Sequence, residues 1–167
     1  MGQDYTKHNL LFISKYPEII HEFSDAMKDR DIEIETAING IEAAAKIKKK
    51  NYDVVITGLS LEGYNGEQLI TYLNKTAPST VCIIYTTTIS SAQLHFFINE
   101  RNVFRVFLRP VDFRGAFWEA LEEAYEYHAV QVKNEEDTGA RRQEQEKQER
   151  EIEIMDQRMR SQRQTRE

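Results

Sequence analysis

The stretch that decides the fold runs from residue 53 to residue 58 and reads Asp53-Val54-Val55-Ile56-Thr57-Gly58. Its four central residues are all β-branched, which favours a strand. Three of them are apolar in an unbroken row, so we expect both faces of this strand to be buried, as in a parallel sheet covered by helices on each side. Gly58 follows at the carboxyl end of the strand, where sheets of this kind collect functional side chains.

Five short apolar runs alternate with helical patterns along the chain. The expected strands are Asn9–Ser14, Ile32–Thr36, Asp53–Thr57, Thr80–Tyr85 and Val103–Leu108. Apolar residues at spacings of three and four predict helices at Pro17–Asp29, Gly40–Lys50, Gly66–Lys75, Ser90–Glu100 and from Phe113 onward. This alternation predicts a doubly wound α/β domain whose working crevice lies at the carboxyl ends of the strands.

Composition limits the domain count and the classes of partner. The chain has 167 residues, 40% of them hydrophobic, which is enough for one domain and an extension. We expect the domain at residues 8–133 and the extension at residues 134–167. The net charge of −6 argues against nucleic-acid binding, which needs a basic surface. No stretch reaches the roughly 18 apolar residues of a membrane span, so we expect no membrane partner.

Cysteine and histidine usage narrows the setting further. Cys82 is the only cysteine and lies in an apolar run, which excludes an internal disulfide and fits a reducing cytoplasm. The first seven residues lack the apolar core of a signal peptide, so we predict a cytoplasmic protein. The four histidines lack the spacing of a metal site, so we predict no metal.

The extension from residue 134 to residue 167 cannot build a core. It holds no aromatic residue, ten acidic and eight basic residues, and six glutamines. Interleaved opposite charges suit an exposed helix, and Ile152, Met155 and Met159 follow one helical side. That is too short for a firm coiled-coil prediction. A charged helical connector and a disordered tail both remain open, with Gly139 a plausible break.

Four motifs stand at the loops and strands of this pattern: Leu10–Ile19, Asn39–Ala44, Thr57–Gly66 and Phe104–Pro110. Together they resemble the receiver domain of bacterial two-component response regulators over roughly residues 9–130. The resemblance implies a flavodoxin-like fold, with a five-stranded parallel sheet in the order 2-1-3-4-5. It also implies a cis peptide bond before Pro110.

The resemblance places the family's phosphorylation site on five residues of this chain. In the family, two acidic residues after the first strand hold a divalent cation, and an aspartate after the third strand accepts the phosphoryl group. The matching positions are Ser14, Lys15 and Gly58, so none of the three carboxylates is present. Thr86 matches the family's Ser or Thr that contacts the phosphoryl group, and Arg109 matches its lysine. We predict a vestigial phosphorylation pocket with no catalytic residue, no metal and no cofactor.

Two other interpretations of this pocket stay open. Lys15, Thr86 and Arg109 leave the crevice with two cations, which favours an anionic ligand. Alternatively, the chain is a true receiver that uses another acceptor, such as Ser60 or Asp53. Asp53 begins its strand, so we expect it at the wrong edge of the sheet.

We predict a pseudo-receiver, meaning a signalling and protein-interaction module that is independent of phosphorylation and is not an enzyme. In the family, the face of the fourth helix, fifth strand and fifth helix commonly binds a partner or a second copy. We expect Phe96 near the surface, because Leu94, Phe97 and Ile98 can fill the core, and aromatic residues often anchor interfaces. The expected partner-binding residues are His95, Phe96, Asn99, Arg105, Val106, Trp118 and Glu122.

An alternative function is the N-terminal regulatory domain of a larger signalling enzyme, such as a cyclic-dinucleotide enzyme. The extension would then be the connector. Coding sequence beyond Glu167 would distinguish the two functions.

Overall fold

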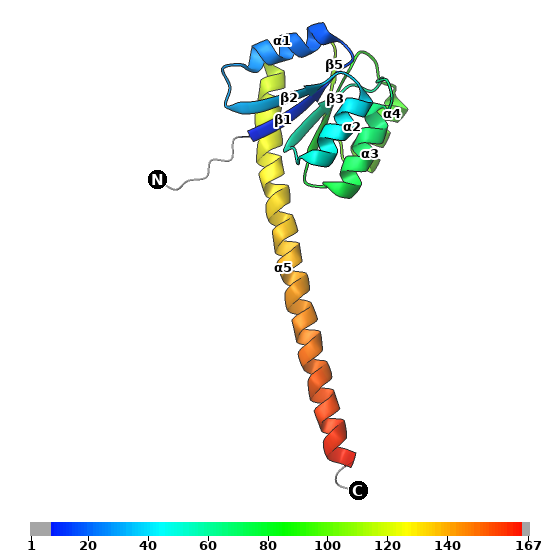
Figure 1. Ribbon diagram of the computed structural model, residues 1–167, viewed down its shortest axis with the longest axis vertical. Helices are drawn as coiled ribbons and strands as arrows, with labels where there is room; N and C mark the ends of the chain where they lie inside the picture. Colours follow the sequence, from blue (N-terminus) through cyan, green and yellow to red (C-terminus); the bar gives the residue numbers. More distant parts are fainter. Residues whose placement is uncertain (1–7, 165–167) are drawn as a thin grey trace. The chain divides into compact units, whose positions relative to one another are not determined.

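A computed structural model describes residues 8–164 and shows a five-stranded parallel sheet (Figure 1). The strands are β1 (His8–Ile13), β2 (Ile32–Ala37), β3 (Val54–Thr57), β4 (Val81–Thr86) and β5 (Arg105–Leu108). Their order in the sheet is β2-β1-β3-β4-β5. The predicted flavodoxin-like fold and strand order are therefore confirmed.

Five helices connect and follow the strands: α1 (Pro17–Met27), α2 (Gly40–Lys49), α3 (Gly66–Thr76), α4 (Ser91–Glu100) and α5 (Ala116–Gln164). Side chains before α2, α3 and α4 accept hydrogen bonds from the first helical turn, which fixes where these helices begin. The fifth helix begins later than the predicted Phe113. Asp112 accepts the amide protons of Arg114 and Gly115 in a turn at distances of 3.0 and 3.3 Å, and this turn occupies the intervening residues.

The core consists of two layers, one on each face of the sheet. Side chains of β1 alternate between them, because successive strand residues point to opposite faces. Leu10 and Phe12 pack with buried residues of α1 and α5, and Leu11 and Ile13 pack with buried residues of α2, α3 and α4. All four are at most 1% exposed, which explains the continuous apolar run in the sequence.

The last strand is shorter than predicted. Its expected start, Val103, is buried but precedes the strand, since Asn102 adopts a left-handed backbone conformation with φ of 53°. The chain joins the sheet where the Phe104 amide donates to the Cys82 carbonyl at 2.8 Å. Ladder pairing with β4 then begins at Arg105.

The charged extension is helical, so of the two open alternatives the helix is confirmed. The described chain separates into two compact units between Ala129 and Val130, close to the predicted boundary after residue 133. Every side chain from Lys133 to Arg163 is exposed. No helix within residues 8–164 is long and apolar enough to span a membrane.

Candidate functional site

The five residues predicted for the vestigial phosphorylation pocket lie together at the carboxyl ends of β1, β3, β4 and β5. Ser14, Lys15, Gly58, Thr86 and Arg109 line one cavity of about 60 Å³. The sheet topology brings together positions that are spread over most of the domain sequence.

The two residues after β1 are poorly suited to hold a divalent cation. The buried Ser14 hydroxyl accepts the Tyr16 amide proton at 3.2 Å and so caps its own turn. The exposed Lys15 places its ammonium 5.3 Å from the centre of the Tyr16 ring. A fixed positive charge at this point repels Mg²⁺, which prefers carboxylate oxygens. Within residues 8–164 no cluster of three metal-ligating side chains is found.

Gly58 holds the end of β3 through its backbone alone. Its amide donates to the Ile13 carbonyl at 3.1 Å, and its carbonyl accepts the Thr57 hydroxyl at 2.8 Å. A β-carbon added to Gly58 would meet its nearest neighbour, the Tyr85 carbonyl oxygen, at 3.7 Å, which is ordinary van der Waals contact. Packing therefore leaves room for a β-carbon at residue 58 and does not require a glycine there.

Gly66 shows what a required glycine looks like in the same loop. A β-carbon on Gly66 would lie 2.2 Å from the Gly58 carbonyl oxygen, a distance that atoms cannot reach. The Gly66 amide also donates to the Leu59 carbonyl at 3.0 Å. Close approach of two backbone segments explains Gly66, whereas a β-carbon at Gly58 would meet no such contact.

Arg109 fills one side of the pocket by stacking on aromatic rings. Its guanidinium carbon lies 4.6 Å from the centre of the Tyr16 ring and 5.8 Å from that of Tyr85. Burial raises the pKa of the Tyr85 hydroxyl above its ordinary value, against the lowering effect of Arg109. The Arg109 amide donates to the Thr86 carbonyl at 2.8 Å, and the expected cis bond to Pro110 is present.

Thr86 directs its hydroxyl at the protein backbone. It donates to the Thr88 carbonyl at 3.2 Å. Of the two cations in this crevice, Arg109 lies beside the rings of Tyr16 and Tyr85, and the Lys15 ammonium lies beside the ring of Tyr16. Thr86 and both cations of the pocket therefore already have partners within the protein.

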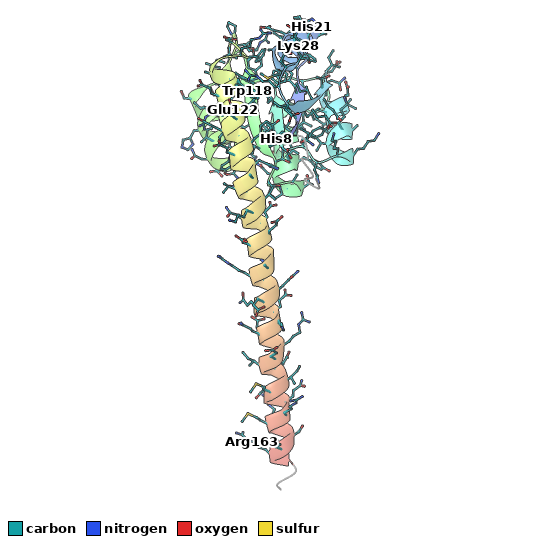
Figure 2. The ribbon with its side chains drawn as sticks, turned by 90° about the vertical axis from the view of Figure 1, so that its left-hand side faces the viewer. His8, His21, Lys28, Trp118, Glu122 and Arg163 are labelled. Carbon is teal, nitrogen blue, oxygen red and sulfur yellow. The ribbon has the colours of Figure 1, made fainter. Side chains whose placement is uncertain are left out.

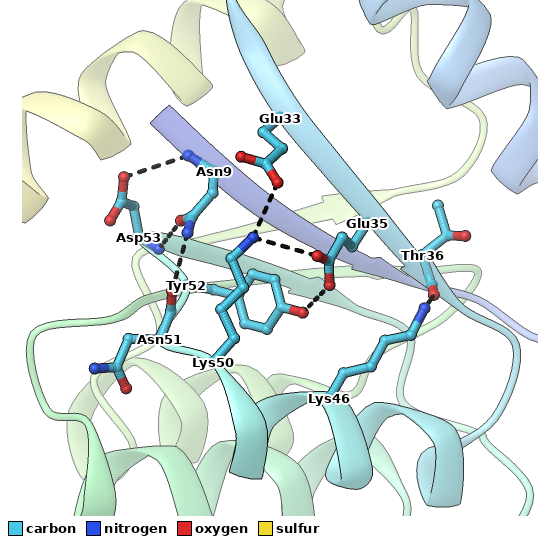
Figure 3. Close-up of polar contacts among 9 residues, drawn as sticks. All are labelled: Asn9, Glu33, Glu35, Thr36, Lys46, Lys50, Asn51, Tyr52 and Asp53. Carbon is cyan, nitrogen blue, oxygen red and sulfur yellow. Dashed lines mark hydrogen bonds and ion pairs between the residues drawn. The ribbon is translucent and has the colours of Figure 1, made fainter. Parts of the chain in front are cut away.

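Asp53, the alternative acceptor, lies at the opposite end of β3, as its sequence position predicts. Figure 3 shows its reciprocal contact with Asn9, whose side-chain oxygen accepts the Asp53 amide at 2.6 Å. Nε2 of His128 lies 3.1 Å from one carboxylate oxygen, and Nδ1 of His8 lies 3.8 Å from the other. Burial favours the neutral acid, but the contacts with His128 and Asn9 outweigh it and hold the pKa of Asp53 below its ordinary value.

This cluster was not predicted from the sequence, because the four histidines were considered only for the spacing of a metal site. Both ring nitrogens of His128 face acceptors, because Nδ1 lies 2.8 Å from the Ser79 carbonyl oxygen. A ring that satisfies both acceptors carries two N–H groups and a positive charge. The Tyr125 hydroxyl donates to the Asn9 carbonyl at 3.0 Å, so α5 contacts the amino end of β1 as well. The cluster fastens α5 to the sheet.

A second polar cluster, also drawn in Figure 3, joins the end of α2 to β2. The Lys50 ammonium contacts Glu33 at 3.0 Å and Glu35 at 3.2 Å, and the Tyr52 hydroxyl donates to Glu35. Burial and the Glu35 carboxylate raise the pKa of Tyr52 above its ordinary value. Each of these charged groups is compensated by its neighbours, so the cluster has a structural role.

The predicted partner-binding residues do not form one face, and this part of the prediction is wrong in position. The Trp118 ring lies 4.2 Å from the guanidinium carbon of Arg30, and Trp118 and Glu122 line a cavity with His8 and Ile32 near β2 (Figure 2). Strands β2 and β5 are opposite edges of the sheet. Trp118 and Glu122 therefore lie away from the α4–β5 side.

The other five predicted residues do lie on α4 and β5. His95, Asn99 and Arg105 are exposed, whereas Phe96 and Val106 are half-buried. Arg105 contacts Glu123 of α5 at 3.0 Å, so this part of the predicted face includes α5.

On α4, Phe97 is buried as expected, but the expected positions of Phe96, Leu94 and Ile98 are wrong. Phe96 packs against the core on the side of α3, with the guanidinium of Arg101 4.7 Å from its ring centre. Leu94 and Ile98, which were expected to fill the core, are 40% and 41% exposed. The spacing places these residues on one side of α4 but does not say which flank meets the sheet.

Leu108 adds a third exposed aliphatic side chain on the same side of the sheet. It is 52% exposed and stands two residues after Val106, which packs on the α4 layer of the core. Strand alternation puts Leu108 on that face as well. We call Leu94, Ile98 and Leu108 the α4–β5 aliphatic patch.

Comparison with known families identifies the class of protein. The family model of the response regulator receiver domain matches residues 11–115, which is more than half of the chain. The chain therefore belongs to the response regulator receiver family and is a receiver-domain signalling module. No curated protein matched the chain significantly.

Solved structures agree on the fold at low sequence identity. The signal receiver domain of an HD domain-containing protein from Pseudomonas fluorescens is 20% identical, with a TM-score of 0.70, covering 74% of this chain and 98% of its own. A structure of adenylate cyclase from Rhodopirellula baltica is 20% identical, with a TM-score of 0.71, and the match covers 78% of this chain and 96% of the adenylate cyclase chain. A CheY-like receiver domain protein from Methanospirillum hungatei is 19% identical, with a TM-score of 0.68, and the match covers 75% of this chain and 99% of the Methanospirillum chain.

Proposed function

We propose that this receiver domain signals without phosphorylation, as a pseudo-receiver that binds a protein partner or a second copy through its α4–β5–α5 face. The observation that carries the proposal is the pocket at Gly58. Phosphoryl transfer needs an acceptor carboxylate and a metal held by oxygen ligands, and the pocket offers Gly58, Ser14 and Lys15 in their place. A β-carbon at residue 58 would meet only ordinary van der Waals contacts, which supports the proposal that the acceptor was not lost because of packing.

The proposed contact surface is centred on the α4–β5 aliphatic patch. Exposed aliphatic side chains beside an edge strand suit a protein interface. Two contacts with α5 border the patch. The guanidinium of Arg105 lies 3.0 Å from a carboxylate oxygen of Glu123. The exposed Tyr127 stacks on Phe104, with 5.1 Å between the ring centres. Arginine and tyrosine are enriched in interface anchors. The face therefore offers an apolar centre with a polar and aromatic border.

Binding measurements on single variants test this face. Ile98→Asp and Leu108→Asp should each weaken binding of a captured partner, or self-association, by about 2 kcal/mol or more, the scale of interface hot spots. Ile41→Asp is the matched control, since Ile41 is an exposed aliphatic residue on α2. Lys15→Ala should leave binding unchanged. If Lys15→Ala abolished binding while both patch variants bound normally, an anion-binding pocket would replace the proposed interface.

A second candidate is a regulatory domain of a larger signalling enzyme, such as one that acts on a cyclic dinucleotide. The long helix α5, of 49 residues, favours it because such a helix can serve as a connector. Receiver-like domains also occur in the structures of an HD domain-containing protein and an adenylate cyclase. Coding sequence for an enzymatic domain after Glu167 would favour this candidate, and a stop codon there would exclude it.

A further inference from the structure

The C-terminal part of α5 carries a line of uncharged side chains, here called the tail stripe: Gln145, Gln148, Ile152, Met155 and Met159. They follow one another at steps of three, four, three and four, so they lie along one side of the helix. Ile152, Met155 and Met159 are 67%, 63% and 58% exposed. Ile154, which is 49% exposed, lies outside this line, and most other side chains of the segment are charged. An exposed apolar line on such a helix fits the apolar side of another helix.

Charge is unevenly divided along the same helix. Residues 144–156 hold six carboxylates and two basic side chains, whereas residues 157–163 hold three arginines and no carboxylate. Two copies aligned in parallel would place acidic segment against acidic segment and basic against basic. Two antiparallel copies would place the arginines of each helix beside the carboxylates of the other.

We propose that the tail stripe is a self-association surface, on which a second copy of this chain binds in the antiparallel direction. The surface is separate from the α4–β5 aliphatic patch, and the inference does not rest on the proposed function. Its apolar core is short, with three residues from each helix, so association is weak and depends on concentration.

Heptad positions make the direction specific. With Ile152 at position a, Met155 takes d, and the flanking positions e and g set partner orientation. In a parallel pair, position g of one helix faces the next e position of the other. Glu151 would then face Asp156 of the second copy, and Arg158 would face Arg163. Like charges meet at both places, which disfavours the parallel pair.

The antiparallel alignment changes these contacts. Residue numbers rise along one helix of an antiparallel pair and fall along the other, so residues at the same level have a constant sum. If Ile152 lies level with Met155 of the second copy, Gln148 therefore lies level with Met159 of the second copy. Position g then faces position g, so Glu151 lies beside Arg158 of the second copy, offset by two residues or about 3 Å of helical rise. The symmetry of the pair makes this contact twice.

Two like-charge approaches remain in the antiparallel pair, both on the other flank: Glu149 lies near Asp156 of the second copy, and Arg142 lies near Arg163. Asp156 already contacts Arg160 of its own helix at 3.1 Å. This ion pair reduces the net charge that Asp156 presents to a neighbour. The balance of flanking charges therefore still favours the antiparallel direction.

Disulfide trapping in the full-length chain tests the direction. Gln148→Cys and Met159→Cys chains, mixed in equal amounts under mild oxidation, should form the mixed disulfide well above the share that random pairing gives. Intact mass distinguishes the mixed product from the two symmetric ones. Burial raises the pKa of the only native thiol, Cys82, to about 12, so it does not compete. Predominant symmetric disulfides would overturn the antiparallel pairing, and so would a monomer at high concentration with no disulfide product.

Charge variants give an independent readout by light scattering or sedimentation. Arg158→Glu should weaken self-association several-fold in the antiparallel pair, because it faces the carboxylates of the second copy. In a parallel pair the same substitution would strengthen association by facing Arg163. Arg150→Glu is the matched control, since Arg150 lies at the outward position f and contacts Glu146 of its own helix at 3.9 Å. Stronger association of Arg158→Glu, or equal weakening by both variants, would refute the proposed surface.

Discussion

Replacing Gly58 by alanine should stabilise the domain slightly, although the residue lies at the centre of the pocket. The added β-carbon would have its nearest neighbours at 3.7 Å and 4.0 Å, so no atom has to move. The backbone of Gly58 has no positive φ, unlike that of Gly63. A glycine-to-alanine change at a compatible position stabilises a protein by about 0.4–1 kcal/mol, because it restricts the unfolded chain.

Gly66→Ala is the matched comparison in the same loop. Its β-carbon would lie 2.2 Å from the Gly58 carbonyl oxygen, so the backbone has to shift. Overpacking of this kind costs about 1–3 kcal/mol or more. Urea unfolding, followed by fluorescence of the single tryptophan, Trp118, reports on the domain in both variants. A loss of more than about 1 kcal/mol in Gly58→Ala would show that the backbone requires this glycine, and would refute the argument that only chemistry was lost.

Three further outcomes are expected. Incubation with acetyl phosphate and Mg²⁺ should add no phosphoryl group to the strand-end crevice, and a stable gain in intact mass that maps there would contradict the proposed function. A chain of residues 1–133 should keep the thermal midpoint of the domain but lose the self-association that the tail stripe supplies, as light scattering would show; the same number of subunits in the particles of both chains would argue against the dimerising helix. The lowered pKa of Asp53 stabilises the fold above the unfolded value of about 4, and this contribution is lost as pH falls through the folded value. His128→Ala should therefore lose more stability near pH 6 than near pH 3 in urea unfolding, and an equal loss at both values would argue against the ion pair.

The strands could be predicted because their signal is local. Val54, Val55 and Ile56 are fully buried and form an unbroken apolar run, so both the strand and the parallel sheet follow from a few neighbouring residues. The pocket could be placed for a related reason. Once the order of the strands is given, residues at their carboxyl ends, such as Ser14 and Gly58, must meet at one edge of the sheet.

The side surfaces could not be predicted in the same way. Helical spacing groups Leu94 with Ile98, but the angle at which α4 meets the sheet decides which of its flanks is covered. Trp118 was misplaced because its neighbour, Arg30, follows a different helix and is remote in sequence. The contact between Asp53 and His128 depends on two distant residues as well, and no local pattern announces it.

Helix α5 combines two very different environments in a single element. Its first turns bury Phe117, Leu121 and Ala124 in the core, whereas every side chain from Lys133 to Arg163 is exposed. Backbone amides in the first part exchange with solvent only when the domain opens, whereas those in the second are protected only by the helix–coil equilibrium, which tertiary packing does not reinforce. Amide exchange should therefore fall from strong to weak protection along this one helix, and on heating its far end should unwind gradually before the domain melts cooperatively.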